Sequence, residues 1–318
     1  LVQLDGVKDI IYFIMNKYIS IFFCVQIIAL NLFAMQPKVT PVDYVRPQID
    51  THKSRWFFFS SASRPFGMVS LSPDTWTEGS WNSGYLYNSK EIRCFSHVHC
   101  WQLAGVPVMP TTGEVKGHKG MDAYKSTYSH ETEIVKPGYH KVELDTYQIR
   151  VELTSTSRVG MHRYTYPAGE KANVLFDVGA LLAHGKTEKA AIHRISSKEI
   201  GGYSVLAPTS RRKKPVTVYF VARFNQNMTA FGGWEKEGKE KKLVHKNSIE
   251  GADIGGYASF GKLKKQTLLM KVGISYVSEE QARINLEKEL AHWNFDRVKE
   301  DAFAEWNRQL GKITVEGG

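Results

Sequence analysis

The sequence has few cysteines, and their spacing argues against the common zinc-binding domains. Cys24, Cys94 and Cys100 form neither a CxxC motif nor a Cys/His pattern of the kind that binds zinc. Cys94 and Cys100 would lie about 20 Å apart on one extended strand, beyond the reach of a disulfide. We therefore predict free, buried thiols, although a turn between the two residues would allow them to pair.

Long apolar runs are also scarce. The one example, Ile19–Phe33, has about 15 residues, short of the roughly 20 that span a bilayer. Lys17 precedes the run and Ala34 follows it as a small residue, an arrangement typical of secretory signal peptides. A lipid anchor at Cys24 is the alternative, but large residues precede this cysteine where small ones are expected.

These features predict how the N-terminal part of the chain is processed. Residues 1–14 do not begin with Met and are expected to come from translation upstream of the true start. Residues 15–34 are the predicted signal peptide. The mature chain is then periplasmic or secreted, starts near Met35 and has no membrane span.

Positive charge is in excess, with a formal net charge of +10. The Lys and Arg residues are scattered, and the one tight block is Arg211–Lys214. A charge run of this length is more often a solvated loop than a nucleic-acid patch. We therefore expect no nucleic acid as a partner.

Helical periodicity is nearly absent between residues 35 and 277. His140–Leu153 alternates apolar and polar residues, and Val216–Phe224 and Leu268–Val277 are rich in β-branched and aromatic residues. Gly-Gly pairs and other turn signals separate such runs. Repeated strands of this kind predict a mainly β fold, a large antiparallel β-sandwich, over residues 35–277.

The period changes at Ser278. Ser278–Gln281 has the form of a capping box, and Ala282, Leu286 and Leu290 then recur every four residues. A second helix is predicted from about Asp296, and Gly311 ends it. The sequence therefore predicts two α-helices over residues 278–311 that link the sandwich to the segment 312–318.

Arg64–Gly113 is the stretch that points to function. It contains three tryptophans but little Lys, and turn chemistry such as Ser72-Pro73-Asp74 interrupts its apolar runs. Aromatic rings beside Asn, Asp, His and Gln suit a sugar, whose C–H groups stack on a ring while its hydroxyls form directional hydrogen bonds.

Three motifs of this stretch resemble glycoside hydrolase family 92. They are PFGMVSLSPDT (65–75), WNSGYLY (81–87) and IRCFSHVHCWQLAGVPVMPTTG (92–113). The resemblance continues through FDVGALL (176–182) to VGISYVSEEQARINLEKEL (272–290) and WNRQLGKITVEGG (306–318).

The resemblance implies an inverting, calcium-dependent exo-α-mannosidase whose sandwich domain precedes an (α/α)6-barrel. Its catalytic acid and base and most of its Ca²⁺ ligands would then belong to the barrel, which is expected to begin at residues 312–318. We therefore assign no catalytic or metal-ligating residue and no cofactor to this chain. It is expected to be inactive alone, with the barrel and a mannose-containing glycan as its partners.

The candidate sugar-binding residues come from the same stretch. The resemblance implies that an aromatic residue of the loop around Trp81 reaches the sugar; the other interpretation is a ring that plugs the end of the sandwich. His97 and His99 would point to one face of a strand, as a polar cleft wall, a structural pair or an edge of a metal site. Asp74 could face the sugar or accept backbone N–H bonds in a turn. The remaining candidates are Asn82, Trp101 and Gln102.

Besides a domain that docks the barrel, two functions remain open on the sequence alone: a stand-alone carbohydrate-binding module and a purely structural sandwich. A stand-alone carbohydrate-binding module would show a polar-rimmed aromatic cleft and measurable affinity for mannosides. A docking domain would instead expose a large apolar patch, and a purely structural sandwich would show neither. Arg64 is a further candidate for contact, either with a carboxylate of the barrel or with a surface partner.

Overall fold

The computed structural model describes residues 12–19, 21–22, 39–52, 60–78, 84–99, 105–180, 185–209 and 212–315. The chain divides into two units, Leu1–Thr40 and Pro41–Gly318. In the first unit, residues 12–19 and 21–22 are helical, and most of the predicted signal peptide lies outside the described residues. Across the described part of the chain, no helix combines the length and apolar character needed to cross a membrane.

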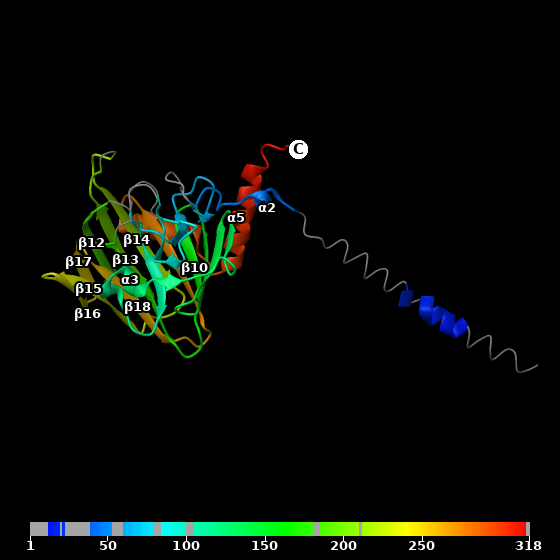
Figure 1. Ribbon diagram of the computed structural model, residues 1–318, viewed down its shortest axis with the longest axis horizontal. Coiled ribbons are helices and arrows are strands. Elements are labelled where there is room, and N and C mark those ends of the chain that lie inside the picture. Colours follow the sequence, from blue (N-terminus) through cyan, green and yellow to red (C-terminus); the bar gives the residue numbers. More distant parts are fainter. Residues whose placement is uncertain are drawn as a thin grey trace, which may run out of the picture. The chain divides into compact units, whose positions relative to one another are not determined.

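The second unit is built on two large antiparallel sheets, which confirms the predicted sandwich (Figure 1). Among the described residues the first sheet has eight strands, in the order β1 (Ala62–Ser63), β2 (Ser70–Asp74), β4 (Cys94–Ser96), β5 (Val108–Thr112), β11 (Lys171–Phe176), β18 (Gly255–Lys262), β15 (Ala230–Glu237) and β16 (Glu240–Val244).

The second sheet has nine described strands, in the order β17 (Ser248–Gly251), β12 (Thr187–Arg194), β13 (Glu199–Leu206), β14 (Val216–Phe224), β19 (Thr267–Ser275), β10 (Val159–Thr165), β9 (Ile149–Ser155), β8 (Tyr139–Leu144) and β7 (Ile134–Lys136). A small pair joins β3 (Glu91–Ile92) to β6 (Ser126–Thr127). The short helical elements are α2 (Pro41–Tyr44), η1 (Gly117–Lys119) and α3 (Met121–Tyr124).

Alternation along the strands fills the space between the two sheets. The apolar residues of β8 and β9 that the sequence places on one face are all buried in the main core: Val142, Leu144, Ile149, Val151 and Leu153. Burial of each such side chain stabilises the fold by about 1.5–3 kcal/mol.

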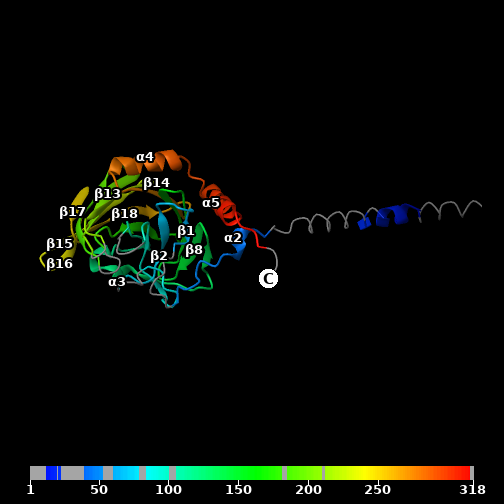
Figure 2. The ribbon, with the colours of Figure 1, turned by 90° about the horizontal axis from the view of Figure 1, so that it is seen from above.

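Two longer helices cover the outer face of the nine-stranded sheet (Figure 2). The first, α4 (Glu279–Glu289), begins as predicted, since the Ser278 hydroxyl accepts a hydrogen bond from the Gln281 amide. The second, α5 (Phe295–Leu310), begins one residue before the predicted start, with Asn294 as its cap. A second core lies beneath the helices and contains Met161, Val221, Ala282, Leu286 and Val298.

Polar contacts fix the helices to the sandwich. Glu289 of α4 pairs with Arg158, and Arg64 donates to Glu305 of α5 at 2.8 Å and to the Val298 carbonyl at 3.2 Å. Arg64 therefore binds a carboxylate of the helical segment. Gly273 permits the close contact on α4, because a Cβ there would lie 2.4 Å from the Ala282 carbonyl oxygen.

The turn predicted at Ser72-Pro73-Asp74 is wrong, since these residues belong to β2 and pair with Cys94–Ser96. Proline is tolerated there, as it is near strand ends where its missing N–H costs little.

In the basic block, Arg212 donates to the Ala207 carbonyl at 2.7 Å and to the Lys214 carbonyl, so its guanidinium stabilises the loop.

Candidate functional site

A buried polar cluster lies where β2 and β4 meet. It consists of Asp74, Cys94, Ser96 and His99, and we call it the Asp74 cluster. One carboxylate oxygen of Asp74 lies 2.8 Å from His99 Nε2, and the other accepts from the Ser96 hydroxyl at 2.5 Å and the Cys94 thiol at 3.3 Å. The Asp74 carboxylate thus has three donors and no exposed surface.

These contacts differ from both roles predicted for Asp74, a contact with the sugar and an acceptor of backbone N–H bonds in a turn. Its side chain neither faces an open cleft nor accepts backbone N–H bonds in a turn; it bonds to three side chains. Cys94 is free and buried, as predicted, and burial followed by the nearby Asp74 charge raises the pKa of its thiol. Cys24 and Cys100 lie outside the described residues.

His99 carries the positive charge of the cluster. Its Nδ1 lies 2.6 Å from the Ser70 carbonyl oxygen and its Nε2 faces Asp74, so both ring nitrogens face acceptors and both donate. Burial alone would lower the pKa of His99, but the attraction of Asp74 and these hydrogen bonds raise it overall. Asp74 and His99 therefore form a buried ion pair.

His97 has a different environment, which removes it from the set of sugar contacts in this structure. Its side chain is fully buried, with Nδ1 2.8 Å from the Val106 carbonyl oxygen and Nε2 2.8 Å from Nε2 of His162. His162 belongs to the opposite sheet, and its Nδ1 accepts from the Tyr164 hydroxyl. Burial lowers the pKa of His97 to about 4, so the ring is neutral. This histidine bridges the two sheets instead of lining a cleft.

The metal interpretation of the two histidines has no support from their surroundings. Each ring is already bonded to protein groups on both nitrogens. Within the described ranges there is no group of three or more His, Cys, Asp or Glu side chains placed to hold a metal ion.

The four other predicted sugar contacts, Trp81, Asn82, Trp101 and Gln102, lie outside the described residues. The bases of their loops are described. Gly84 exchanges backbone hydrogen bonds with Trp76, and the His97 amide donates to the Gly105 carbonyl at 2.7 Å. Asp74 comes shortly before the first loop and His99 immediately before the second. The buried ion pair therefore holds the two loop bases together, while the four contacts stay predictions.

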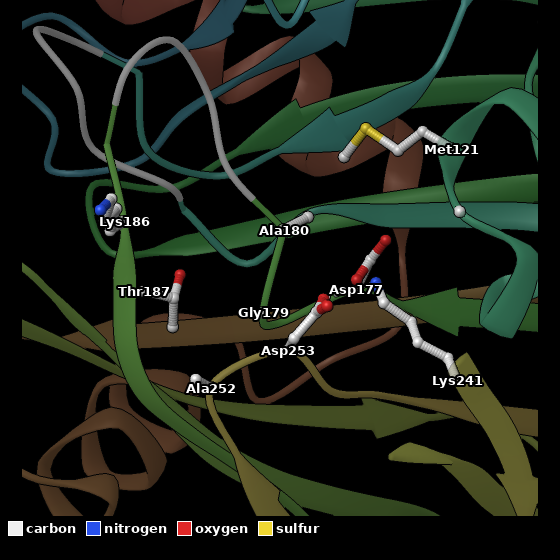
Figure 3. Close-up of a pocket in the computed structure, with 10 residues that line it drawn as sticks. Met121, Asp177, Gly179, Ala180, Lys186, Thr187, Lys241, Ala252 and Asp253 are labelled. Carbon is white, nitrogen blue, oxygen red and sulfur yellow. Dashed lines mark ion pairs between the residues drawn. The ribbon is translucent and has the colours of Figure 1, made fainter. Parts of the chain in front are cut away.

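The structure also has a pocket of about 400 Å³, and the charge of its lining residue Asp177 acts on the Cys94 thiol of the Asp74 cluster. Figure 3 shows the residues that line the pocket. Asp177, which follows β11, lies on its wall and accepts from the Tyr124 hydroxyl at 2.7 Å. Lys241 and Asp253 form an ion pair at 2.5 Å on the same side of the pocket. The remaining lining residues are Gly120, Met121, Gly179, Ala180, Lys186, Thr187 and Ala252.

The sequence interpretation did not include this pocket. Its best signal was an acidic residue directly after a buried strand, in the FDVG motif at residues 176–179. Asp177 is only 5% exposed, and burial raises the pKa of its carboxyl to about 6, although Tyr124 and Lys241 act against that rise.

Asp177→Asn is expected to raise the free energy of unfolding at pH 7 by about 1–3 kcal/mol. The folded pKa of about 6 exceeds the ordinary 3.8, so folding favours the protonated carboxyl. That stability is lost as the pH rises through about 6, and Asn avoids the loss while it still accepts from Tyr124. The difference should shrink at pH 4. Urea denaturation at both pH values measures it, with the exposed Asp145→Asn as control. A variant no more stable than the wild type at pH 7 would contradict the raised pKa of this carboxyl.

Comparison with known proteins supports the resemblance seen in the motifs. Residues 44–275 match the model of the glycosyl hydrolase family 92 N-terminal domain, and residues 281–318 match that of the family's catalytic domain. The segment predicted as a helical linker therefore overlaps the catalytic-domain match.

Solved structures agree. A family GH92 alpha-mannosidase from Bacteroides thetaiotaomicron is 29% identical, with a TM-score of 0.79 over 89% of this chain and 40% of that one. A GH92 inverting mannosidase from the same species is 23% identical, with a TM-score of 0.75, and supports the fold.

A curated relative, an uncharacterized secreted glycosidase of Arthroderma benhamiae, is 24% identical over 290 residues. This chain spans 37% of that relative and 40% of the Bacteroides alpha-mannosidase. Since the family model of the N-terminal domain covers most of the sandwich, the chain belongs to glycosyl hydrolase family 92.

Proposed function

We propose that this chain is the N-terminal part of a secreted α-mannosidase, and that it supplies one wall of the sugar-binding centre. In this proposal the loops at residues 79–83 and 100–104 carry the aromatic contacts, Trp81 first among them. The acid and base that hydrolyse the α-mannosidic bond with inversion come from the rest of the catalytic domain, and so do most ligands of a Ca²⁺ ion.

The observation that carries the proposal is the buried ion pair between Asp74 and His99. A rigid contact of this kind costs desolvation energy and is a weak source of stability. Its position makes sense if the spacing of the two loops matters, because it fixes both loop bases at one end of the sandwich. Aromatic side chains held in that way can stack on the C–H face of a sugar.

Export is the second part of the proposal. Residues 15–34 have the charge and apolar pattern of a signal peptide, and the Arthroderma benhamiae relative is described as secreted. The mature chain is then periplasmic or extracellular, where mannose-containing glycans are accessible.

The decisive experiment compares the chain with a fusion that completes the catalytic domain. The chain is joined through its residues 281–318 to the remainder of that domain from the Bacteroides alpha-mannosidase. With Ca²⁺, the fusion is expected to hydrolyse an aryl α-mannoside and the chain alone is not. Trp81→Ala in the fusion should lower kcat/KM by roughly tenfold or more, through the lost stacking contact.

Two controls make the result interpretable. Trp293→Ala in the fusion removes a tryptophan of the helical segment that packs on Lys271 and on the core beneath the helices, and should change kcat/KM much less than Trp81→Ala. Turnover by the chain alone would contradict the assignment of the acid and base to the rest of the catalytic domain. A folded fusion that cleaves other aryl glycosides but no α-mannoside would contradict the proposed substrate.

A further inference from the structure

The pocket beside Asp177 has the size and polarity of a ligand site. Its volume of about 400 Å³ lies near the lower end of the roughly 300–1,000 Å³ usual for small-molecule sites. The residues around it come from separate parts of the chain: the η1–α3 segment, the end of β11, the start of β12, strand β16 and the turn after β17. None of the described lining residues belongs to the two aromatic loops.

The charges around the pocket are balanced. Asp177 and Asp253 oppose Lys186 and Lys241, so neither an anion nor a cation gains a net attraction. The Lys241 ammonium lies against Asp253 at 2.5 Å, which disfavours a metal ion between the carboxylates. A neutral ligand that both donates and accepts hydrogen bonds fits such a lining best.

The arrangement of donors and acceptors further limits the chemical class of ligand that fits the pocket. Figure 3 shows the side chains of Asp177, Asp253 and Lys241 converging on one side of the pocket, with Thr187 across from them. A carboxylate offers about four lone-pair sites and an ammonium three N–H donors, and the contacts to Tyr124 and between Lys241 and Asp253 use only part of this capacity. Adjacent hydroxyls on a ring match such a pair, since each hydroxyl accepts from the ammonium and donates to a carboxylate.

The small and apolar residues complete the site. Gly179 leaves no room for a side chain, because an added Cβ would lie 2.6 Å from the Ile254 amide nitrogen. Gly120 has a φ of +84°, a conformation that favours glycine, and places Met121 at the rim. Met121 and Ala180 provide the apolar surface that the C–H face of a ring requires.

We propose that this pocket binds a neutral, hydroxyl-rich ligand of the size of one pyranose ring, with Asp177, Asp253 and Lys241 as its hydrogen-bonding residues. The site is additional to the sugar-binding wall of the proposed function and does not depend on it. It would hold a second sugar unit at the same end of the sandwich.

The test is a calorimetric titration of the chain with D-mannose, D-glucose and D-galactose, with saturation-transfer NMR as a second readout. At least one hexose is expected to bind with a dissociation constant on the order of 1 mM, as for a small ligand held by a few hydrogen bonds. Lys241→Ala should weaken this binding roughly tenfold or more, because it removes a charged donor.

A matched control lies next in the sequence. Lys242 pairs with Glu237 on the surface and does not line the pocket, so Lys242→Ala should leave binding within about twofold of the wild type. Ala252→Trp, at an exposed position on the rim, should block the pocket without disturbing the core. Circular dichroism checks that each variant is folded.

The outcomes separate this site from the aromatic loops. Loss of binding in Lys241→Ala but not in Trp81→Ala supports the pocket. Loss in Trp81→Ala but not in Lys241→Ala supports the proposed loop contact and overturns the pocket. Absence of saturable binding by all three hexoses also overturns it, and leaves the fusion experiment to decide the proposed function.

Discussion

Asp74→Ala is expected to lower the free energy of unfolding by about 3–5 kcal/mol, the usual cost of removing one partner from a buried ion pair. The substitution leaves the His99 cation buried without its carboxylate and deprives the Ser96 hydroxyl of its acceptor at 2.5 Å. Urea denaturation at pH 6 measures the loss. Asp122→Ala, at a side chain that is 74% exposed, should cost less than about 1 kcal/mol and serves as the control.

The pH dependence of the same variant identifies the ion pair as the cause. The pKa of His99 is raised by folding above its ordinary 6.5, so the stability from the pair is fully present below about pH 6.5. It is lost as the pH rises through the folded pKa. The difference between wild type and Asp74→Ala should therefore be larger at pH 6 than at pH 9. An equal difference at both pH values would show that the loss comes from packing and not from charge.

Trp234→Ala is expected to cost about 3–5 kcal/mol, as for other large aromatic side chains removed from a core. The indole is fully buried and lies between two glycines: a Cβ at Gly117 would fall 2.2 Å from the ring, and one at Gly255 would fall 2.1 Å from it. Two backbone segments therefore rest directly on the ring. Deletion of the ring leaves a cavity that neither segment can fill with a side chain.

Trp234→Phe provides the matched variant. Within the described part of the chain the indole Nε1 has no hydrogen-bond partner, so its loss removes an unsatisfied donor while most of the ring surface stays. We expect less than half the cost of the Ala variant, measured by thermal and urea denaturation. Because Gly117 begins the η1–α3 segment, Trp234→Ala should also weaken hexose binding at the pocket. An Ala variant as stable as the Phe variant would contradict the packing described for this ring.

Local chemistry made much of the fold predictable from the sequence. The alternation at Val142, Leu144 and Ile149 determines which face of each strand is buried, and the Ser278 cap and its Leu286 stripe define α4 from neighbouring residues. The family motifs cover the same elements. By contrast, Pro73 suggested a turn because proline and its polar neighbours favour turns, and only pairing with Phe95 across the sheet reveals a strand.

The site was less predictable, because its contacts join residues that are distant in the sequence. The i, i+2 spacing of His97 and His99 suggests a shared face. Nothing local indicates that one ring meets His162 on the other sheet while its neighbour pairs with Asp74. The pocket is harder still, since Asp177 and Lys241 approach each other only after β11 and β16, with β18 and β15 between them, have assembled in one sheet. Sequence motifs located the loops, whereas tertiary packing determined which polar side chains pair at the bases of the loops.

The order of strands in the nine-stranded sheet has a consequence for biosynthesis. Strand β19, the last strand of the sandwich to be synthesised, lies at the centre of that sheet between β14 and β10. Until its residues leave the ribosome, the strands on either side remain two separate halves with open edges that invite aggregation. The sandwich is therefore expected to complete its folding only after Ser275 has been synthesised, and a nascent chain arrested before Thr267 should depend on chaperones, whether at the ribosome or during export.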